Sequence, residues 1–148
     1  MSGAKNSLGT IFSVETAVAD TFIAIEEIID IPSILGDKMG KIDVTSLDSV
    51  GYKEFIADGL KEAPEVTIRC NFTNATGQLR VTTLAGTGEN TKFKLELPNK
   101  VTPTTGHGTT IVREGYISSR GITAGKGAQL IMEFTIQFSG APVETAAN

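Results

Sequence analysis

AQLIMEFTIQF, residues 128–138, decides the fold class, because apolar and polar side chains alternate along most of its length. Successive side chains of a β-strand point to opposite faces, so this alternation is typical of a strand with one buried side. The segments 65–72 and 91–98 repeat the pattern, and 109–119 repeats it more weakly. The positions expected to face the core are Val66, Ile68, Cys70, Phe72, Phe93, Leu95, Leu97, Leu130, Met132, Phe134, Ile136 and Phe138.

Two more strands are predicted from less regular stretches. Residues 21–29 are rich in isoleucine, and Pro32 follows shortly after them, where a residue without an amide hydrogen ends the pairing. Residues 40–46 place Ile42 and Val44 on one side of a short strand.

One helix is predicted over residues 75–86. Asn74 is a favourable N-cap and Gly86 lies where a helix end is expected. Leu79 and Leu84 are the candidates for its buried side. The β-branched content of this segment gives it a mediocre helix propensity, so its stability must come from packing on the sheet.

This order of elements has no alternation of strands and helices, which excludes a parallel α/β architecture. We expect a mainly β protein, an antiparallel β-sandwich or barrel with one flanking α-helix, in a single domain over residues 1–148. Residues 1–19 and 140–148 are rich in small and polar types, and we expect a flexible arm and a flexible tail there.

The charge and cysteine content narrow the class of protein. Lys and Arg number 13 and Asp and Glu number 17, a net charge of −4. This balance argues against a protein that holds nucleic acid by neutralising phosphates. One cysteine cannot form an internal disulfide, which is consistent with assembly in a reducing cytoplasm. No apolar run approaches the ~20 residues of a membrane-spanning helix, so no membrane insertion is expected.

No catalytic, cofactor or metal site can be built from the sequence. His107 lies between two glycines and has no second histidine to complete a metal site, so we interpret it as an exposed loop residue. Cys70 shares the phase of the apolar strand positions and is expected in the core. The glycines of 121–130 resemble a phosphate-binding loop, but the spacing is wrong and a strand follows, which favours a β-hairpin. We therefore expect no enzyme.

Most of segment 43–64 fits neither the predicted strands nor the predicted helix. Tyr52, Phe55, Ile56 and Leu60 have the spacing of one face of a short helix, and acidic and basic residues surround them. Either this predicted helix folds back onto its own sheet, or it exposes apolar groups for a neighbouring molecule. The sequence does not choose between the two.

At the level of families, the chain resembles the major tail proteins, or tail tube proteins, of long-tailed bacteriophages with non-contractile tails. The similar stretches are Lys41–Phe72, Phe93–Asn99, Arg113–Ile122 and Gln129–Pro142. Together they cover roughly residues 21–142.

The resemblance implies the phage tail tube fold, shared with type VI secretion tubes, and a structural virion protein whose six copies form a ring. Rings would stack into a tube around a tape-measure protein, with initiator and terminator proteins at its ends, in the bacterial cytoplasm. The finished virion would pass DNA through the lumen. Six subunits carry 6 × (−4) = −24, and any share of this charge facing the lumen would repel phosphates.

Under this hypothesis, segment 43–64 orders against an adjacent subunit, the loop 98–110 reaches an adjacent ring, and residues 1–19 dock on a neighbour. The residues expected at subunit interfaces are Leu47, Tyr52, Phe55, Ile56, Leu60, Ile11, Phe12 and His107. The alternatives are a related tube or connector protein, such as a secretion tube or tail terminator, and a monomeric ligand-binding β-sandwich.

Overall fold

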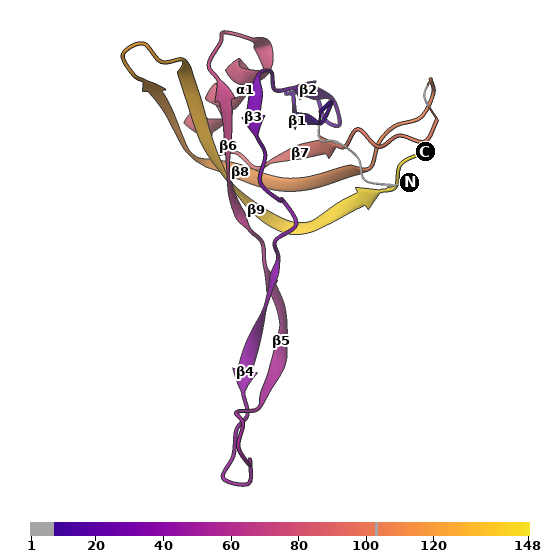
Figure 1. Ribbon diagram of the computed structural model, residues 1–148, viewed down its shortest axis with the longest axis vertical. Helices are drawn as coiled ribbons and strands as arrows, with labels where there is room; N and C mark the ends of the chain where they lie inside the picture. The colour runs from indigo at the N-terminus through magenta and orange to yellow at the C-terminus, as the bar shows by residue number, and fades with distance from the viewer. Residues whose placement is uncertain (1–7, 103) are drawn as a thin grey trace.

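The computed structural model describes residues 8–102 and 104–148. The chain forms one large curled sheet, one helix, and a long hairpin that projects away from the sheet (Figure 1). The elements are β1 (Ile11–Glu15), β2 (Phe22–Ala24), β3 (Ile28–Asp30), β4 (Lys38–Asp43), β5 (Phe55–Glu62), β6 (Glu65–Asn71), α1 (Thr76–Thr87), β7 (Thr91–Glu96), β8 (Thr110–Ala124) and β9 (Leu130–Thr145).

The large sheet has seven strands in the order β2-β1-β7-β8-β9-β6-β3, and every neighbouring pair is antiparallel. Its two edge strands, β2 and β3, are joined by only residues 25–27. A flat sheet of this size would separate its edges by about 29 Å. The connecting backbone can span at most about 15 Å. The sheet therefore curls until its edges meet, and the expectation of a mainly β, antiparallel sandwich or barrel with one helix is confirmed.

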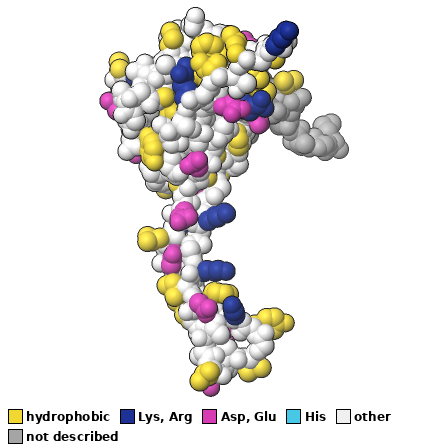
Figure 2. Space-filling view, turned by 90° about the vertical axis from the view of Figure 1, so that its left-hand side faces the viewer, with side chains coloured by type: hydrophobic (Ala, Val, Ile, Leu, Met, Phe, Trp, Pro, Cys, Tyr) yellow, Lys and Arg dark blue, Asp and Glu magenta, His cyan; other side chains and the backbone are white. Residues whose placement is uncertain are grey.

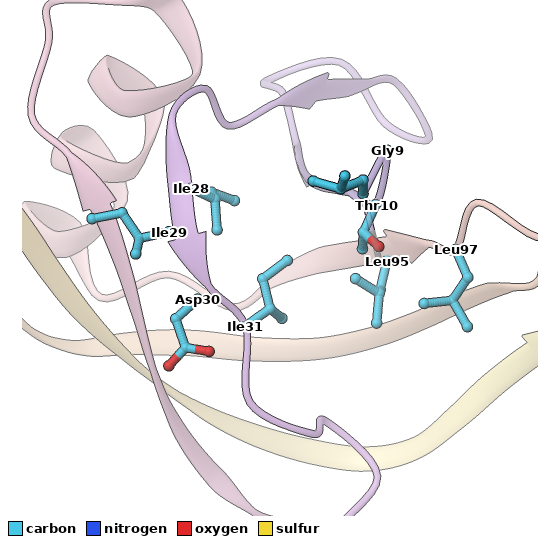
Figure 3. A pocket seen from close by; sticks show the side chains of 9 residues that line it. Gly9, Thr10, Ile28, Ile29, Asp30, Ile31, Leu95 and Leu97 are labelled. Carbon is cyan, nitrogen blue, oxygen red and sulfur yellow. The ribbon is translucent and has the colours of Figure 1, made fainter. Parts of the chain in front are cut away.

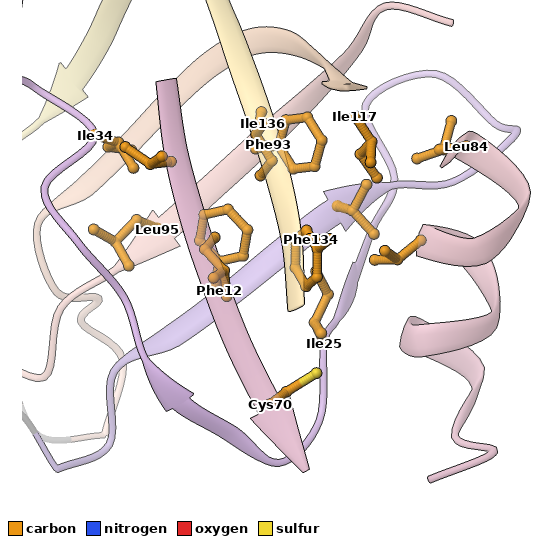
Figure 4. Packing of buried hydrophobic residues seen from close by; sticks show 14 of the residues in the cluster. Phe12, Ile25, Ile34, Cys70, Leu84, Phe93, Leu95, Ile117, Phe134 and Ile136 are labelled. Atoms are coloured by element: carbon orange, nitrogen blue, oxygen red, sulfur yellow. The ribbon is translucent and has the colours of Figure 1, made fainter. Parts of the chain in front are cut away.

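The core lies on the concave side of the curled sheet (Figure 4). Phe93 is central to it, because its ring stacks on Phe12 at a centroid distance of 5.9 Å and meets the edge of Phe138 at 6.0 Å. The inward positions predicted on β6, β7 and β9 are buried, with three exceptions: Phe72 and Leu97 are partly buried and Leu130 is exposed.

The helix covers one end of this core and differs from its prediction at both ends and on its buried face. Ala75, not Asn74, is its N-cap and makes no side-chain capping bond; Gly88, not Gly86, ends the helix in a left-handed conformation. Leu84 is buried as predicted, but Leu79 is exposed. Residues five apart lie about 140° apart around a helix, so the two leucines cannot share a face.

The predicted strand over 21–29 is two strands, β2 and β3, on opposite edges of the sheet. The break is at Glu27, whose φ of 60° turns the chain. Gln78 of α1 holds this corner, because its side-chain amide donates to the carbonyl oxygens of Glu26 (3.0 Å) and Asn71 (2.8 Å). The helix thus fixes the turn that lets the sheet curl.

Much of the predicted arm is a strand of the core sheet. Ile11–Glu15 pairs with β2 and β7, and Phe12 and Val14 are buried. The prediction of an unanchored arm is therefore wrong for these residues, and residues 1–7 lie outside the described part of the chain. The alternation here covers only a few positions, so its pairing with distant strands decides the structure.

The predicted flexible tail is wrong as well, because residues 140–145 continue β9 and residues 143–145 pair with β8. Pro142 argues against a strand in the sequence, because proline has no amide hydrogen to donate to a neighbouring strand. The structure accommodates it in a bulge: Ser139 pairs with Glu114 and Val143 with Val112, so residues 140–142 face Arg113 alone.

Candidate assembly surface

The most unusual feature of the molecule is the β4–β5 hairpin. Within the described part of the chain the two strands pair only with each other, and they form a separate two-stranded sheet. The hairpin leaves the body as a narrow ribbon, and every residue of β5 is exposed (Figure 1). The predicted helix over 52–60 is therefore wrong. Gly59, at a φ of 85°, lies where the register of the ribbon shifts, and it disrupts the period-two pattern that would have revealed a strand.

Apolar side chains lie along the whole ribbon and its turn, next to charged ones (Figure 2). Opposite residues of an antiparallel pair share a face. Ile42 pairs with Ile56 on one face, while Phe55, opposite Asp43, lies on the other. Both faces therefore carry exposed apolar groups. The exposed apolar side chains of the hairpin are Met39, Ile42, Val44, Leu47, Val50, Tyr52, Phe55, Ile56 and Leu60.

Local contacts shape the hairpin without burying these groups. The Thr45 hydroxyl accepts a hydrogen bond from the Glu54 amide at 2.8 Å, and the Asp43 carboxylate accepts one from the Thr45 amide at 2.9 Å. The bonds from Thr45 lower the pKa of Asp43. Lys41 places its ammonium 4.3 Å from the centre of the Phe55 ring. A two-stranded hairpin without a packed face is marginally stable in water, so these contacts leave most of its surface to be stabilised by something else.

The hairpin is fixed to the body at its base. Two connecting segments join it to the body: the first leg, residues 31–37, leads into β4, and the second leg, residues 63–64, follows β5. On the second leg, the Phe138 amide donates to the Pro64 carbonyl at 3.2 Å. On the first leg, Ile34 is buried, and Asp37 accepts a hydrogen bond at 2.6 Å from the guanidinium of Arg113. The Arg113 hydrogen bond lowers the pKa of Asp37. The charge of the hairpin is nearly balanced, with four lysines and five acidic residues over 38–62.

The structure brings together five of the eight residues predicted at interfaces: Leu47, Tyr52, Phe55, Ile56 and Leu60 all lie on the hairpin and are exposed. The interface prediction also omitted Ile42 and Val44, which were assigned only to a short strand, and it missed Met39 and Val50; all four are exposed on the same element. Met39 and Val50 belong to no period-two or helical pattern. Only their apolar character within a charged segment could have indicated an interface role.

The other three residues lie on the body. Ile11 is exposed on β1, but Phe12 is buried in the core of its own chain and offers no free surface. His107 is partly buried, and its amide donates to the Asn148 side chain at 2.9 Å. The amide of Asn148 in turn donates to the His107 carbonyl at 3.0 Å. The loop expected to reach a neighbouring ring is thus joined to the end of its own chain.

The described residues offer little for chemistry. Within 8–102 and 104–148, no three His, Cys, Asp or Glu side chains gather as a metal site would require, and no helix is long and apolar enough to cross a membrane. Cys70 is buried in the core as predicted, and burial raises the pKa of its thiol to about 11. A thiol of this kind is protonated at neutral pH and is a poor nucleophile.

A cavity of about 400 Å³ lies where the curled sheet closes on itself (Figure 3). Ile28 and Ile31 reach it from one edge, Leu95 reaches it from β7, and Leu97 reaches it from just beyond the end of that strand. Its lining contains no histidine or cysteine. The cavity follows from the curl of the sheet, and most of its lining is apolar.

Neither the family models nor the curated proteins contain a match to this sequence. Several solved structures are similar. The tail of an empty GTA (gene transfer agent) particle with C6 symmetry has a TM-score of 0.77 at 19% identity, over 97% of this chain and 100% of that chain. The sheath/tube terminator structure of the PVC extracellular contractile injection system has a TM-score of 0.68 at 16% identity, over 97% of each chain.

The SPP1 tail tube has a TM-score of 0.61 at 14% identity, over 93% of this chain and 76% of that chain. At such identities the likeness is one of fold. The likeness extends over more than nine tenths of the present chain in each of the three structures. This chain has the fold of tail tube proteins.

Proposed function

We propose that this protein is a structural virion subunit that polymerises as stacked hexameric rings into a tail tube. The observation that carries the proposal is the hairpin, which exposes apolar side chains on both faces and pairs with no other strand among the described residues. Exposed apolar surface of this extent marks a site of protein contact. In a polymer of identical subunits, the contact surface can come from further copies of the chain.

A ribbon with apolar groups on both faces needs cover on both. We infer that the hairpin lies between two neighbouring subunits, with Ile42 and Ile56 against one and Phe55 against the other. Its balanced charge suits this position, because no single strong field has to be neutralised on either side. In the free subunit the turn end of the ribbon frays, while its base stays attached to the body, and the turn end becomes ordered when neighbours cover it. This delay keeps the subunit from polymerising before an initiator protein provides a template.

The similarity to a tail with C6 symmetry supports a ring of six. A closed ring also removes exposed strand edges, because each subunit covers the margins of the next. The role is mechanical and not enzymatic. The tube would assemble around a tape-measure protein in the host cytoplasm, end at a terminator, and later conduct DNA. Six copies carry a net charge of −24, and any share of it that faces the lumen would repel phosphates from the wall.

A second candidate is a terminator or connector of the same fold, favoured by the likeness to the PVC sheath/tube terminator structure. A terminator forms one ring and stops, whereas a tube protein adds ring upon ring. The two candidates therefore differ in the length of the polymer that the pure protein forms.

Electron microscopy of the purified protein at high concentration tests the proposal. The expected result is tubes of variable length with sixfold symmetry. Single hexameric rings that never stack would favour the terminator. A protein that stays monomeric at every concentration, and after addition of short preformed tube fragments, would overturn both candidates.

A further inference from the structure

Arg113 occupies a position where a strand residue would ordinarily be apolar. It lies on β8 between core residues Ile111 and Ile117 and is only 2% exposed. Burying a guanidinium is costly unless its hydrogen bonds are satisfied and its charge is paired. The cost implies that the surrounding structure is arranged to hold it.

The guanidinium connects three separate segments. One terminal nitrogen donates to the Asp37 carboxylate (2.6 Å) and to the Ile34 carbonyl (2.9 Å). The other donates to the Gly140 carbonyl (2.9 Å), which lies in the bulge of β9. The ring of Phe138 lies 5.7 Å from the guanidinium carbon. These contacts join the first leg of the hairpin to the two longest strands of the body.

The bulge has a specific part in this arrangement. Gly140 has a φ of 74°, a conformation that a side chain would strain. Because residues 140–142 stand against Arg113 alone, the carbonyl of Gly140 turns toward the guanidinium instead of pairing across the ladder. The bulge therefore serves as part of the binding site for the Arg113 side chain.

The surroundings of the first leg are otherwise open. A cavity of about 420 Å³ lies at the base of the hairpin and is lined by Asp37, Lys61, Ala63, Arg113 and residues 138–141. The leg is thus not packed on all sides at this level. The direction in which it leaves the body depends on the hydrogen bonds of Arg113 and on the buried side chain of Ile34.

We propose that Arg113 and Asp37 form a latch that fixes the angle at which the hairpin leaves the body, and so positions it for docking between neighbours. The docking role rests on the proposed function; the latch itself is a property of the free subunit. Of the two residues, Asp37 is the one that can move out of the contact. It is partly exposed, whereas Arg113 is enclosed by the body.

Distance measurements between two spin labels test the latch in dilute, monomeric protein. The labels are placed by Leu60→Cys, near the base of the hairpin and below its fraying end, and by Thr83→Cys on the exposed side of α1, and Cys70 stays in place because it is buried. With Asp37 intact we expect one narrow distance peak. Asp37→Asn, which keeps the shape and removes the charge, should lose that peak to a broad distribution.

Two further variants make the result specific. Asp37→Glu retains the carboxylate and should restore a narrow peak. Asp30→Asn removes an exposed carboxylate that makes no contact with Arg113 and should leave the peak unchanged. A distribution for Asp37→Asn as narrow as that of the unsubstituted chain would overturn the latch.

Polymerisation of the unlabelled variants separates the two proposals. If the natural chain forms tubes and Asp37→Asn forms them as readily as Asp30→Asn does, the latch has no role in assembly. If the natural chain forms no tubes, the proposed function fails, while the distance peaks still decide whether the latch exists.

Discussion

Ile42 lies directly opposite Ile56 across the β4–β5 hairpin, and yet 48% and 53% of their surfaces are exposed. Cross-strand pairs of β-branched residues stabilise a sheet mainly when something covers them. Here the pair is formed, and no segment within residues 8–102 and 104–148 covers it. This is the physical reason for placing a second copy against the hairpin.

Replacing one member of this pair by a charge should stop assembly without unfolding the subunit. Ile56→Asp changes an exposed residue, so the free energy of unfolding should move by no more than about 0.5 kcal/mol. In an assembled interface the same carboxylate would be buried without a partner, which is strongly unfavourable. We expect a normal thermal unfolding curve and no tubes by electron microscopy.

Leu79 provides the control for this variant, because it is 52% exposed on the outer side of α1, away from the hairpin. Leu79→Asp introduces the same charge at a site of the same exposure and should leave tube formation intact. Tubes formed by Ile56→Asp as readily as by Leu79→Asp would contradict a role for the hairpin in subunit contact.

Two glycines of α1 should respond to alanine in opposite directions. A Cβ at Gly77 would collide with the Ala24 carbonyl at the end of β2, whereas a Cβ at Gly86 meets nothing within 4 Å. Gly77→Ala should destabilise the fold by about 1–3 kcal/mol through overpacking. Gly86→Ala should stabilise it by roughly 0.5–1 kcal/mol, because alanine loses less backbone entropy in a helix. Urea unfolding midpoints measure both; a Gly77→Ala variant as stable as Gly86→Ala would show that the helix does not dock at β2.

Acid should weaken the latch at a defined pH. The hydrogen bond from Arg113 lowers the pKa of Asp37 below its ordinary 3.8, and the nearby Lys61 acts in the same direction. A carboxyl group whose pKa is lowered by folding contributes stability above its unfolded pKa, and this contribution is lost as the pH falls through the folded value. The stability difference between the natural chain and Asp37→Asn should therefore be constant above about pH 5 and shrink below about pH 4.

The difference between the two proteins is the relevant quantity, because Asp43 also has a lowered pKa and titrates in both. Urea unfolding at a series of pH values gives this difference directly. Parallel stability curves for the two proteins down to the acid limit would show that the Asp37 carboxylate contributes nothing through Arg113.

The strands that the sequence predicted well are those with one buried face. Val66, Ile68 and Cys70 alternate with polar residues because only one side of β6 meets the core, and the periodicity records that asymmetry. The hairpin has no such asymmetry. Both of its faces meet solvent in the free subunit, so no phase of the alternation is selected, and Phe55 and Ile56 lie side by side in sequence on opposite faces.

The other wrong predictions concern residues whose structure depends on contacts with distant parts of the chain or on strand register. Phe12 and Val14 are buried because β7 lies beside them, about eighty residues further along the chain, and nothing near them in sequence indicates that partner. Pro142 argues against a strand until the bulge opposite Arg113 is known. The apolar content of segment 43–64 was recognised from sequence and its conformation was not, because two-stranded pairing depends on register and not on composition.

Hydrogen exchange at the hairpin amides, compared between the free subunit and the assembled tube, tests the central claim most directly. In the free subunit the amides of β4 and β5 should exchange far faster than those of β9, a strand that is paired on both sides, with β8 and β6, in the seven-stranded sheet. In the tube, copies of the chain cover the ribbon, and its amides should exchange as slowly as the core. Equal protection of the hairpin in both states would contradict the claim that neighbouring subunits complete it.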